Sequence, residues 1–172
     1  YYQEEFQMSN TLSVVGEPVR AHPSEGVAEL EYNSLRGCRI LFINMPLRES
    51  AKPNTPPQGP GLMAARLRQY GAEPTIVDLN AYRIKDTHSV EQNLPNGRQL
   101  SMREVRVLIE THVGKHGEPD IIALSGMITT LRWQEAVSTI AREIVPDAFI
   151  VSGGGLATEV KMPLLNWIPE LD

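Results

Sequence analysis

Two short stretches decide the fold of this chain: Ala123-Leu124-Ser125-Gly126-Met127 and Val151-Ser152-Gly153-Gly154-Gly155. Each begins with apolar residues typical of a buried strand and ends with small residues typical of a tight turn. Residues 128–153 separate the two turns, which is room for one helix and one strand. This spacing predicts a parallel sheet whose neighbouring strands end at one edge, where ligands bind in open α/β sheets.

The alternation of strand and helix extends over most of the chain. We expect strands at residues 39–44, 74–79, 120–124 and 149–151, and helices at 61–70, from 101 onward, at 131–144 and at 161–168. In the first helix, Leu62, Ala65 and Leu67 are expected to face the core, and Ser101 with Glu104 forms a capping box for the second. Strands joined by helices give parallel pairs with right-handed crossovers. A fifth strand would ordinarily come next, so we expect the sheet to stop before its last strand.

Composition and charge restrict the classes of function. The 172 residues are enough for one domain with a sizeable core, and the net charge is −5 without a cluster of Lys and Arg. Nucleic acid and membranes are therefore not expected partners, and no apolar run approaches the length of a membrane span. The one cysteine, Cys38, excludes a disulfide or cysteine cluster made by this chain alone. We expect a cytoplasmic protein.

Residues 1–36 differ from the rest of the chain. They carry a net charge of −4, from two arginines and six glutamates: Glu4, Glu5, Glu17, Glu25, Glu29 and Glu31. We interpret this segment as an N-terminal extension that precedes an α/β domain at residues 37–172. Contact with the domain or with another one, and a disordered leader, are both compatible with its composition.

The turns at the carboxyl ends of the expected strands hold the candidate binding residues. The glycines at 153–155 allow a ligand to approach the backbone, and Ser125 offers a hydroxyl at the adjacent strand end. A tight turn without a ligand would also explain the glycines, and helix capping is the simpler role for Thr130. The loop from Pro46 to Pro60 is rich in proline, which suits a rigid wall beside a large flat ligand better than a phosphate cradle.

Several of these stretches, taken in order, resemble a known family. They are Pro-Pro-Gln-Gly-Pro-Gly-Leu at 56–62, Ile-Val-Asp-Leu-Asn at 76–80, Ser125-Gly126-Met127 and the glycine turn at 153–155. From about residue 37 to residue 160, the chain resembles the cobalamin-binding domain of cobalamin-dependent radical S-adenosylmethionine enzymes. The resemblance implies a flavodoxin-like (Rossmann-like) parallel sheet with flanking helices, which binds cobalamin (vitamin B12) at its carboxyl edge.

The resemblance also implies how cobalt is held. Methionine-synthase-type domains have a cobalt-ligating histidine after the first strand, and here Pro46 stands at that position. The implied state is base-off cobalamin without a histidine ligand, with Leu47 or Arg48 beneath the corrin. His88 follows a different strand, and His112 with His116 lacks a third ligand, so we expect no metal ligand from the protein.

The implied cofactor-binding residues belong to two parts of the carboxyl edge of the sheet, which we call the rim. The loop from Asn44 to Leu62 would pack under the corrin ring, and the turns after the third and fourth strands would line the slot for the nucleotide tail. The full set is Asn44, Met45, Pro46, Leu47, Arg48, Pro57, Gly59, Gly61, Leu62, Ser125, Gly126, Met127, Thr129, Thr130, Gly153, Gly154, Gly155 and Leu156.

The family's radical domain carries Cys-x-x-x-Cys-x-x-Cys, which this chain lacks because Cys38 is its only cysteine. The resemblance therefore implies a cofactor domain that is not catalytic alone. A radical S-adenosylmethionine domain, in cis or in trans, would supply S-adenosylmethionine and a [4Fe–4S] cluster, and the assembly would act as a methyltransferase or a related enzyme. A fragment and a stand-alone carrier both fit. The alternatives are a flavodoxin-like or receiver-like module that binds flavin or phosphate, and a ligand-free docking module.

Overall fold

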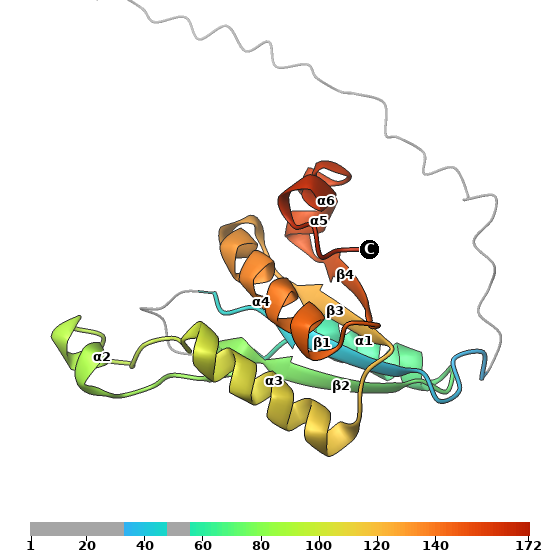
Figure 1. The fold of residues 1–172 in the computed structure, drawn as a ribbon, viewed down its shortest axis with the longest axis horizontal. Coiled ribbons are helices and arrows are strands. Elements are labelled where there is room, and N and C mark those ends of the chain that lie inside the picture. Colours follow the sequence, from blue (N-terminus) through green and yellow to red (C-terminus); the bar gives the residue numbers. More distant parts are fainter. Residues whose placement is uncertain (1–32, 48–55) are drawn as a thin grey trace, which may run out of the picture.

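A single parallel sheet organises the chain. The computed structural model describes residues 33–47 and 56–172. Its strands are β1 (Arg39–Asn44), β2 (Glu73–Asp78), β3 (Ile121–Ser125) and β4 (Phe149–Gly153). They pair in the order β2-β1-β3-β4, and every pair is parallel (Figure 1). This is the order of a flavodoxin-like sheet over these strands, which confirms the predicted α/β fold.

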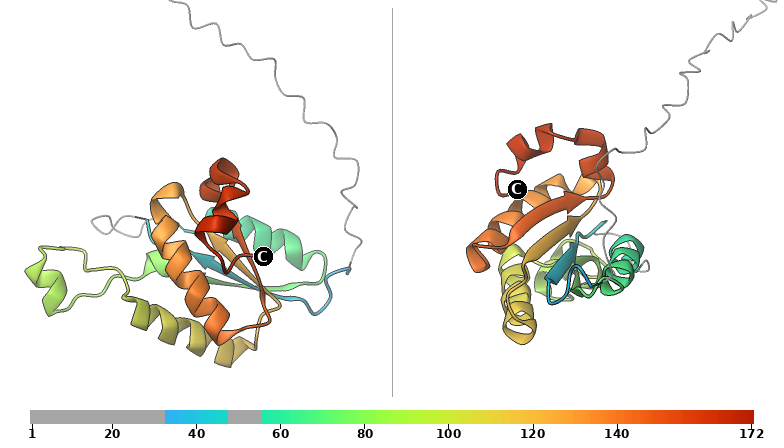
Figure 2. Two further views of the ribbon diagram at one scale, coloured as in Figure 1. Left: turned by 45° about the horizontal axis from the view of Figure 1, so that its top comes forward. Right: turned by 90° about the vertical axis from the view of Figure 1, so that its right-hand side faces the viewer.

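Helices cover both faces of the sheet. Helix α1 (Gln58–Arg68) lies on one face, while α3 (Met102–His116) and α4 (Leu131–Ile144) lie on the other (Figure 2). Two short helices, α5 (Gly155–Val160) and α6 (Pro163–Trp167), follow β4. Single turns η1 (Leu79–Ala81) and η2 (Ile128–Thr130) follow β2 and β3, and α2 (Thr87–Glu91) lies in the excursion between β2 and α3.

The core has two layers because β1 is covered on both sides. Leu41 and Ile43 point toward α3 and α4, whereas Ile40 and Phe42 point toward α1, where Ala64 meets them. This explains why the sequence of β1 is a continuous apolar run rather than an alternating one. Each such side chain stabilises the fold by about 1.5–3 kcal/mol through its burial.

Helix α1 differs from its predicted form. It begins at Gln58, before the predicted start at Gly61, and Pro60 lies in its first turn, where a missing N–H is tolerated. The inward face predicted for Leu62 and Ala65 is wrong, because both are exposed and Ala64 is the buried residue. A small residue at this position lets the helix approach the sheet closely. Leu67 does pack against the core as predicted.

Ion pairs hold the excursion between β2 and α3 in place. Ser101 and Glu104 form the predicted capping box at the start of α3. Arg98 binds Glu104 at 2.7 Å and Asp86, the N-cap of α2, at 2.7 Å. The hydrogen bond from Arg98, followed by those from Ser101, lowers the pKa of Glu104 to about 2. This network ties α2 to α3 through charged hydrogen bonds rather than through an apolar core.

The remaining expectations concern the ends of the domain. The proposed N-terminal extension lies outside the described residues up to residue 32, and Leu35 donates a backbone hydrogen bond to Tyr70 at 2.9 Å. Helix α5 was not predicted, and the expected helix at 161–168 corresponds to α6. Within residues 33–47 and 56–172, no helix combines the length and the apolar character needed to cross a membrane.

Candidate functional site

The four strands end in a row of aligned residues. Asp78, Asn44, Ser125 and Gly153 are register partners on β2, β1, β3 and β4. Register partners in parallel strands share a face, and the row two residues earlier packs on the α1 side of the sheet. Neighbouring strands lie about 4.8 Å apart, so the row is roughly 14 Å long. It places a polar edge next to the start of α1.

A cavity of about 300 Å³ opens beside this row. Its lining joins the first turns of α1 to the turns after β3 and β4, and none of its residues is charged. The residues are Phe42, Gly59, Pro60, Met63, Ala123, Leu124, Ser125, Val151, Ser152, Gly153 and Gly154. The structure thus brings together three groups that were predicted to meet: the start of α1, Ser125 and the glycine turn.

Two glycines of these turns have a packing role. Gly154 has φ +85°, and a Cβ there would lie 2.7 Å from the carbonyl oxygen of Gly126. A Cβ at Gly126 would collide with the hydroxyl oxygen of Thr130 and would lie 2.8 Å from the Nε2 of Gln134. Glycine is therefore needed at position 154 so that the two turns can touch, and at position 126 so that the turn after β3 can pack against Thr130 and α4. Because packing alone accounts for these two glycines, their presence is no evidence for the predicted contact with a ligand.

Other glycines of the rim have no such explanation. A Cβ at Gly59, Gly61 or Gly155 would meet nothing within 4 Å, and at Gly153 only one atom at 3.9 Å. Gly59 and Gly61 lie inside α1, where each glycine costs about 1 kcal/mol relative to alanine. Within the described residues, nothing fills the space beside them, and Gly59 lines the cavity. The lack of side chains at Gly59 and Gly61 leaves the space beside α1 open.

Four of the residues predicted to contact the cofactor are buried beneath the rim instead. Met45 and Leu156 are 0% exposed, Thr130 is 1% exposed, and Pro46 is buried. The hydroxyl of Thr130 donates to the carbonyl of Met127 at 2.8 Å and accepts from its N–H at 3.1 Å. Thr130 therefore shapes the turn after β3 and does not cap α4 with its side chain. Arg48 lies outside the described residues.

Five of the exposed apolar side chains lie in the segments that form the rim. All follow the carboxyl ends of β1 and β3 or belong to the first turns of α1. They are Leu47 (42% exposed), Leu62 (73%), Met63 (57%), Met127 (48%) and Ile128 (54%). Of these five, Met63 lines the cavity, and the other four lie in the neighbouring segments. Pro57 and Thr129 lie in the same segments.

A polar network that the sequence did not reveal fixes the start of the proline-rich loop. Asn44 donates to Asp78 Oδ1 at 2.8 Å, and the N–H of Asn80 donates to the same oxygen at 3.1 Å. Asn80 is 4% exposed, and its Oδ1 accepts from the N–H of Leu47 at 3.0 Å. An Asp two residues before an Asn at a strand end suggests such a turn, but the link to β1 depends on strand register.

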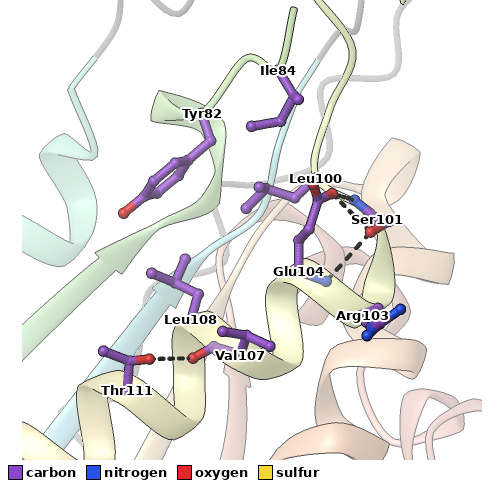
Figure 3. Close-up of a pocket in the computed structure, with 9 residues that line it drawn as sticks. All are labelled: Tyr82, Ile84, Leu100, Ser101, Arg103, Glu104, Val107, Leu108 and Thr111. Carbon is purple, nitrogen blue, oxygen red and sulfur yellow. Dashed lines mark hydrogen bonds between the residues drawn. The ribbon is translucent and has the colours of Figure 1, made fainter. Parts of the chain in front are cut away.

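A larger groove of about 620 Å³ lies between the excursion and α3, with Tyr82, Ile84 and Leu100 facing Val107 and Leu108 (Figure 3). Several of its polar groups are already engaged by the protein. Ser101 and Glu104 bond each other, and Thr111 bonds the carbonyl of Val107 at 2.7 Å (Figure 3). The charged Arg103 and the side chain of Tyr82 also line the groove.

His88, His112 and His116 do not line the cavity. Nε2 of His112 lies 2.9 Å from the hydroxyl of Thr75, and the centroids of the His112 and His116 rings are 4.5 Å apart. Burial, with the nearby His116 and Lys115, lowers the pKa of His112. Within the part of the chain that the structure describes, no three His, Cys, Asp or Glu residues are grouped to hold a metal ion.

Comparison of the sequence with protein-family models and with curated proteins found no match. The fold and the site nevertheless define a class. The chain is a parallel α/β domain of flavodoxin-like strand order, with an uncharged cavity at the carboxyl edge of its sheet.

Proposed function

We propose that this chain binds cobalamin, base-off and without a histidine ligand, at the carboxyl edge of its sheet. The observation that carries the proposal is the cavity between α1 and the turns after β3 and β4, beside an apolar rim. A corrin is a wide disc with a nucleotide tail. The rim offers the disc an apolar surface, and the cavity offers part of the tail an enclosed slot.

Leu47 is the candidate residue beneath cobalt. It is 42% exposed, and the hydrogen bond to Asn80 fixes its backbone. The buried Pro46 has no side-chain nitrogen, and His88, His112 and His116 all lie outside the lining of the cavity. An aliphatic side chain under the ring would leave cobalt without a protein nitrogen. Arg48, the next residue, stays a second candidate.

The chain would act as the cofactor domain of a larger assembly. Cobalamin supplies methyl-transfer or other radical chemistry when bound, and the residues of this chain bind and orient it. A radical S-adenosylmethionine domain, in cis or in trans, would contribute S-adenosylmethionine and the iron–sulfur cluster. We propose a cytoplasmic location, where Cys38 would stay reduced.

A flavin or phosphate module is the second candidate for the same edge. The cavity lining contains no Lys or Arg, so backbone N–H and hydroxyl groups would have to hold the phosphate of a flavin nucleotide or of the cobalamin tail alike. The exposed apolar side chains beside the strand ends favour the larger corrin disc. Phosphate groups are usually bound by basic side chains or clustered backbone N–H groups.

The test uses the full chain without a histidine tag, since tag imidazoles bind cobalt. The protein is mixed with hydroxocobalamin, desalted and examined by visible spectroscopy. Retained absorbance with base-off character is the expected result. A colourless protein overturns the proposal and favours a docking module, and retention of flavin mononucleotide instead favours the second candidate.

A further inference from the structure

Asp78 is the one ionisable residue in the row of strand ends, and half of its carboxylate is unused. Oδ1 accepts both available hydrogen bonds, from Asn44 Nδ2 at 2.8 Å and from the N–H of Asn80 at 3.1 Å. Within the described residues, Oδ2 accepts none, and no Lys, Arg or His pairs with Asp78. By contrast, Asp86 and Asp172 each pair with an arginine at 2.7 Å.

The two bonds to Oδ1 come from different elements. Asn44 belongs to β1, and Asn80 belongs to the turn that follows Asp78 itself. Because both hold the same oxygen, the orientation of the half-buried carboxyl group is fixed, and Oδ2 is left as a preorganised acceptor. Register places Asp78 on the same face as Ser125, two strands away, at a distance of roughly 10 Å.

This distance is within the width of a corrin whose tail enters the cavity. The periphery of the cobalamin corrin carries amide side chains, which have N–H groups to donate. A carboxylate can only accept hydrogen bonds, and it repels a second carboxylate at the same distance. Asp78 would therefore accept a hydrogen bond from a peripheral amide and would repel the carboxylate that forms when this amide is hydrolysed.

We propose that Asp78 determines specificity: its Oδ2 accepts a hydrogen bond from one peripheral amide and so selects amidated corrinoids over those with a carboxylate there. The inference rests on the proposed function, since it names the chemical class of corrinoid that the same site takes. A hydrogen bond to a charged group changes affinity by about tenfold or more, so the selectivity should be at least of this size.

The test compares hydroxocobalamin with its monocarboxylic acids, in each of which one peripheral amide is hydrolysed. Dissociation constants are measured for the wild type, for Asp78→Asn and for Asp147→Asn. Asn retains Oδ1 for the two bonds of the turn but replaces Oδ2 by an N–H donor. Asp147 is an exposed turn residue before β4, so its variant matches the charge change away from the rim.

The wild type and D147N should bind one monocarboxylic acid at least about tenfold more weakly than hydroxocobalamin, and D78N should lose this preference. Equal affinities of the wild type for hydroxocobalamin and every derivative overturn the inference while leaving cobalamin binding intact, even if D78N fails to fold. A preference that D78N retains also overturns it. Failure of the wild type to bind hydroxocobalamin overturns the proposed function itself.

Discussion

The cavity beside α1 and the groove beside α3 are both open and mainly apolar. They differ in how many of their features are explained by the stability of the fold alone. The groove is larger, and an ion pair and a capping box already use several of its polar groups. The cavity is smaller, and it adjoins glycines without a packing role; Asp78, with a carboxylate oxygen that has no partner within the described residues, lies two strands away from Ser125 in the same row of strand ends. Features that stability does not explain are the better guide to a binding site. The predictions below separate the two regions.

The largest expected effect concerns the contact between the two turns. Gly154→Ala places a Cβ against the carbonyl of Gly126 at a positive φ, so unfolding should become easier by about 2 kcal/mol or more. Gly155→Ala is the matched control, because its Cβ would meet nothing within 4 Å. Chemical denaturation of both variants measures the difference. Equal stabilities would show that the two turns do not need to touch.

A smaller effect is expected at the start of the proline-rich loop. Asn80→Ala removes the acceptor of the Leu47 N–H but keeps the backbone N–H that bonds Asp78, and the loss should cost about 1–2 kcal/mol of stability. Hydroxocobalamin binding should weaken as well, since Leu47 loses its fixed position. Thermal unfolding and titration with the cofactor test the two parts. A destabilised variant with unchanged affinity would separate this network from binding.

Acid should loosen the excursion beside α3. The pKa of Glu104 is lowered to about 2, from an ordinary value of 4.5, chiefly by its bond to Arg98. Hydrogen bonding to Ser89 and Arg98 lowers the pKa of Asp86. A lowered carboxyl pKa contributes stability above the unfolded value, and this contribution is lost as pH falls from about 4.5 toward 2.

Hydrogen exchange at pH 5 and pH 3 measures this change. Amides of residues 86–104 should lose protection at pH 3, and Arg98→Gln should show the same loss already at pH 5. The variant should keep its affinity for hydroxocobalamin at neutral pH. Weakened cofactor binding in Arg98→Gln would contradict the separation of the two regions.

The sequence predicted the sheet because continuous apolar runs and regular spacing are local signals. Strand β1 and helix α4 match their expected bounds, and the turns after β3 and β4 meet as their spacing indicated. The inward face of α1 was missed because it depends on how closely Ala64 approaches the sheet. Helix α5 was missed because its six residues have no side-chain cap.

The site was predicted less completely than the fold. The sequence indicated that Ser125, Gly59 and Gly153 would share a rim, and the structure places all three in one cavity. It did not reveal the unused acceptor of Asp78 or the bond from Leu47 to Asn80, because both depend on register between strands far apart in sequence. It also did not distinguish glycines with a packing role from those beside open space.

The central claim is that the space beside α1 is a cofactor slot, and a matched pair of glycines tests it most directly. Gly59 and Gly114 both lie in helices with nothing within 4 Å of a Cβ, but only Gly59 lines the cavity. Titration with hydroxocobalamin should show binding lost in Gly59→Leu and retained in Gly114→Leu, with both variants folded. Equal affinity of the two variants would contradict the account.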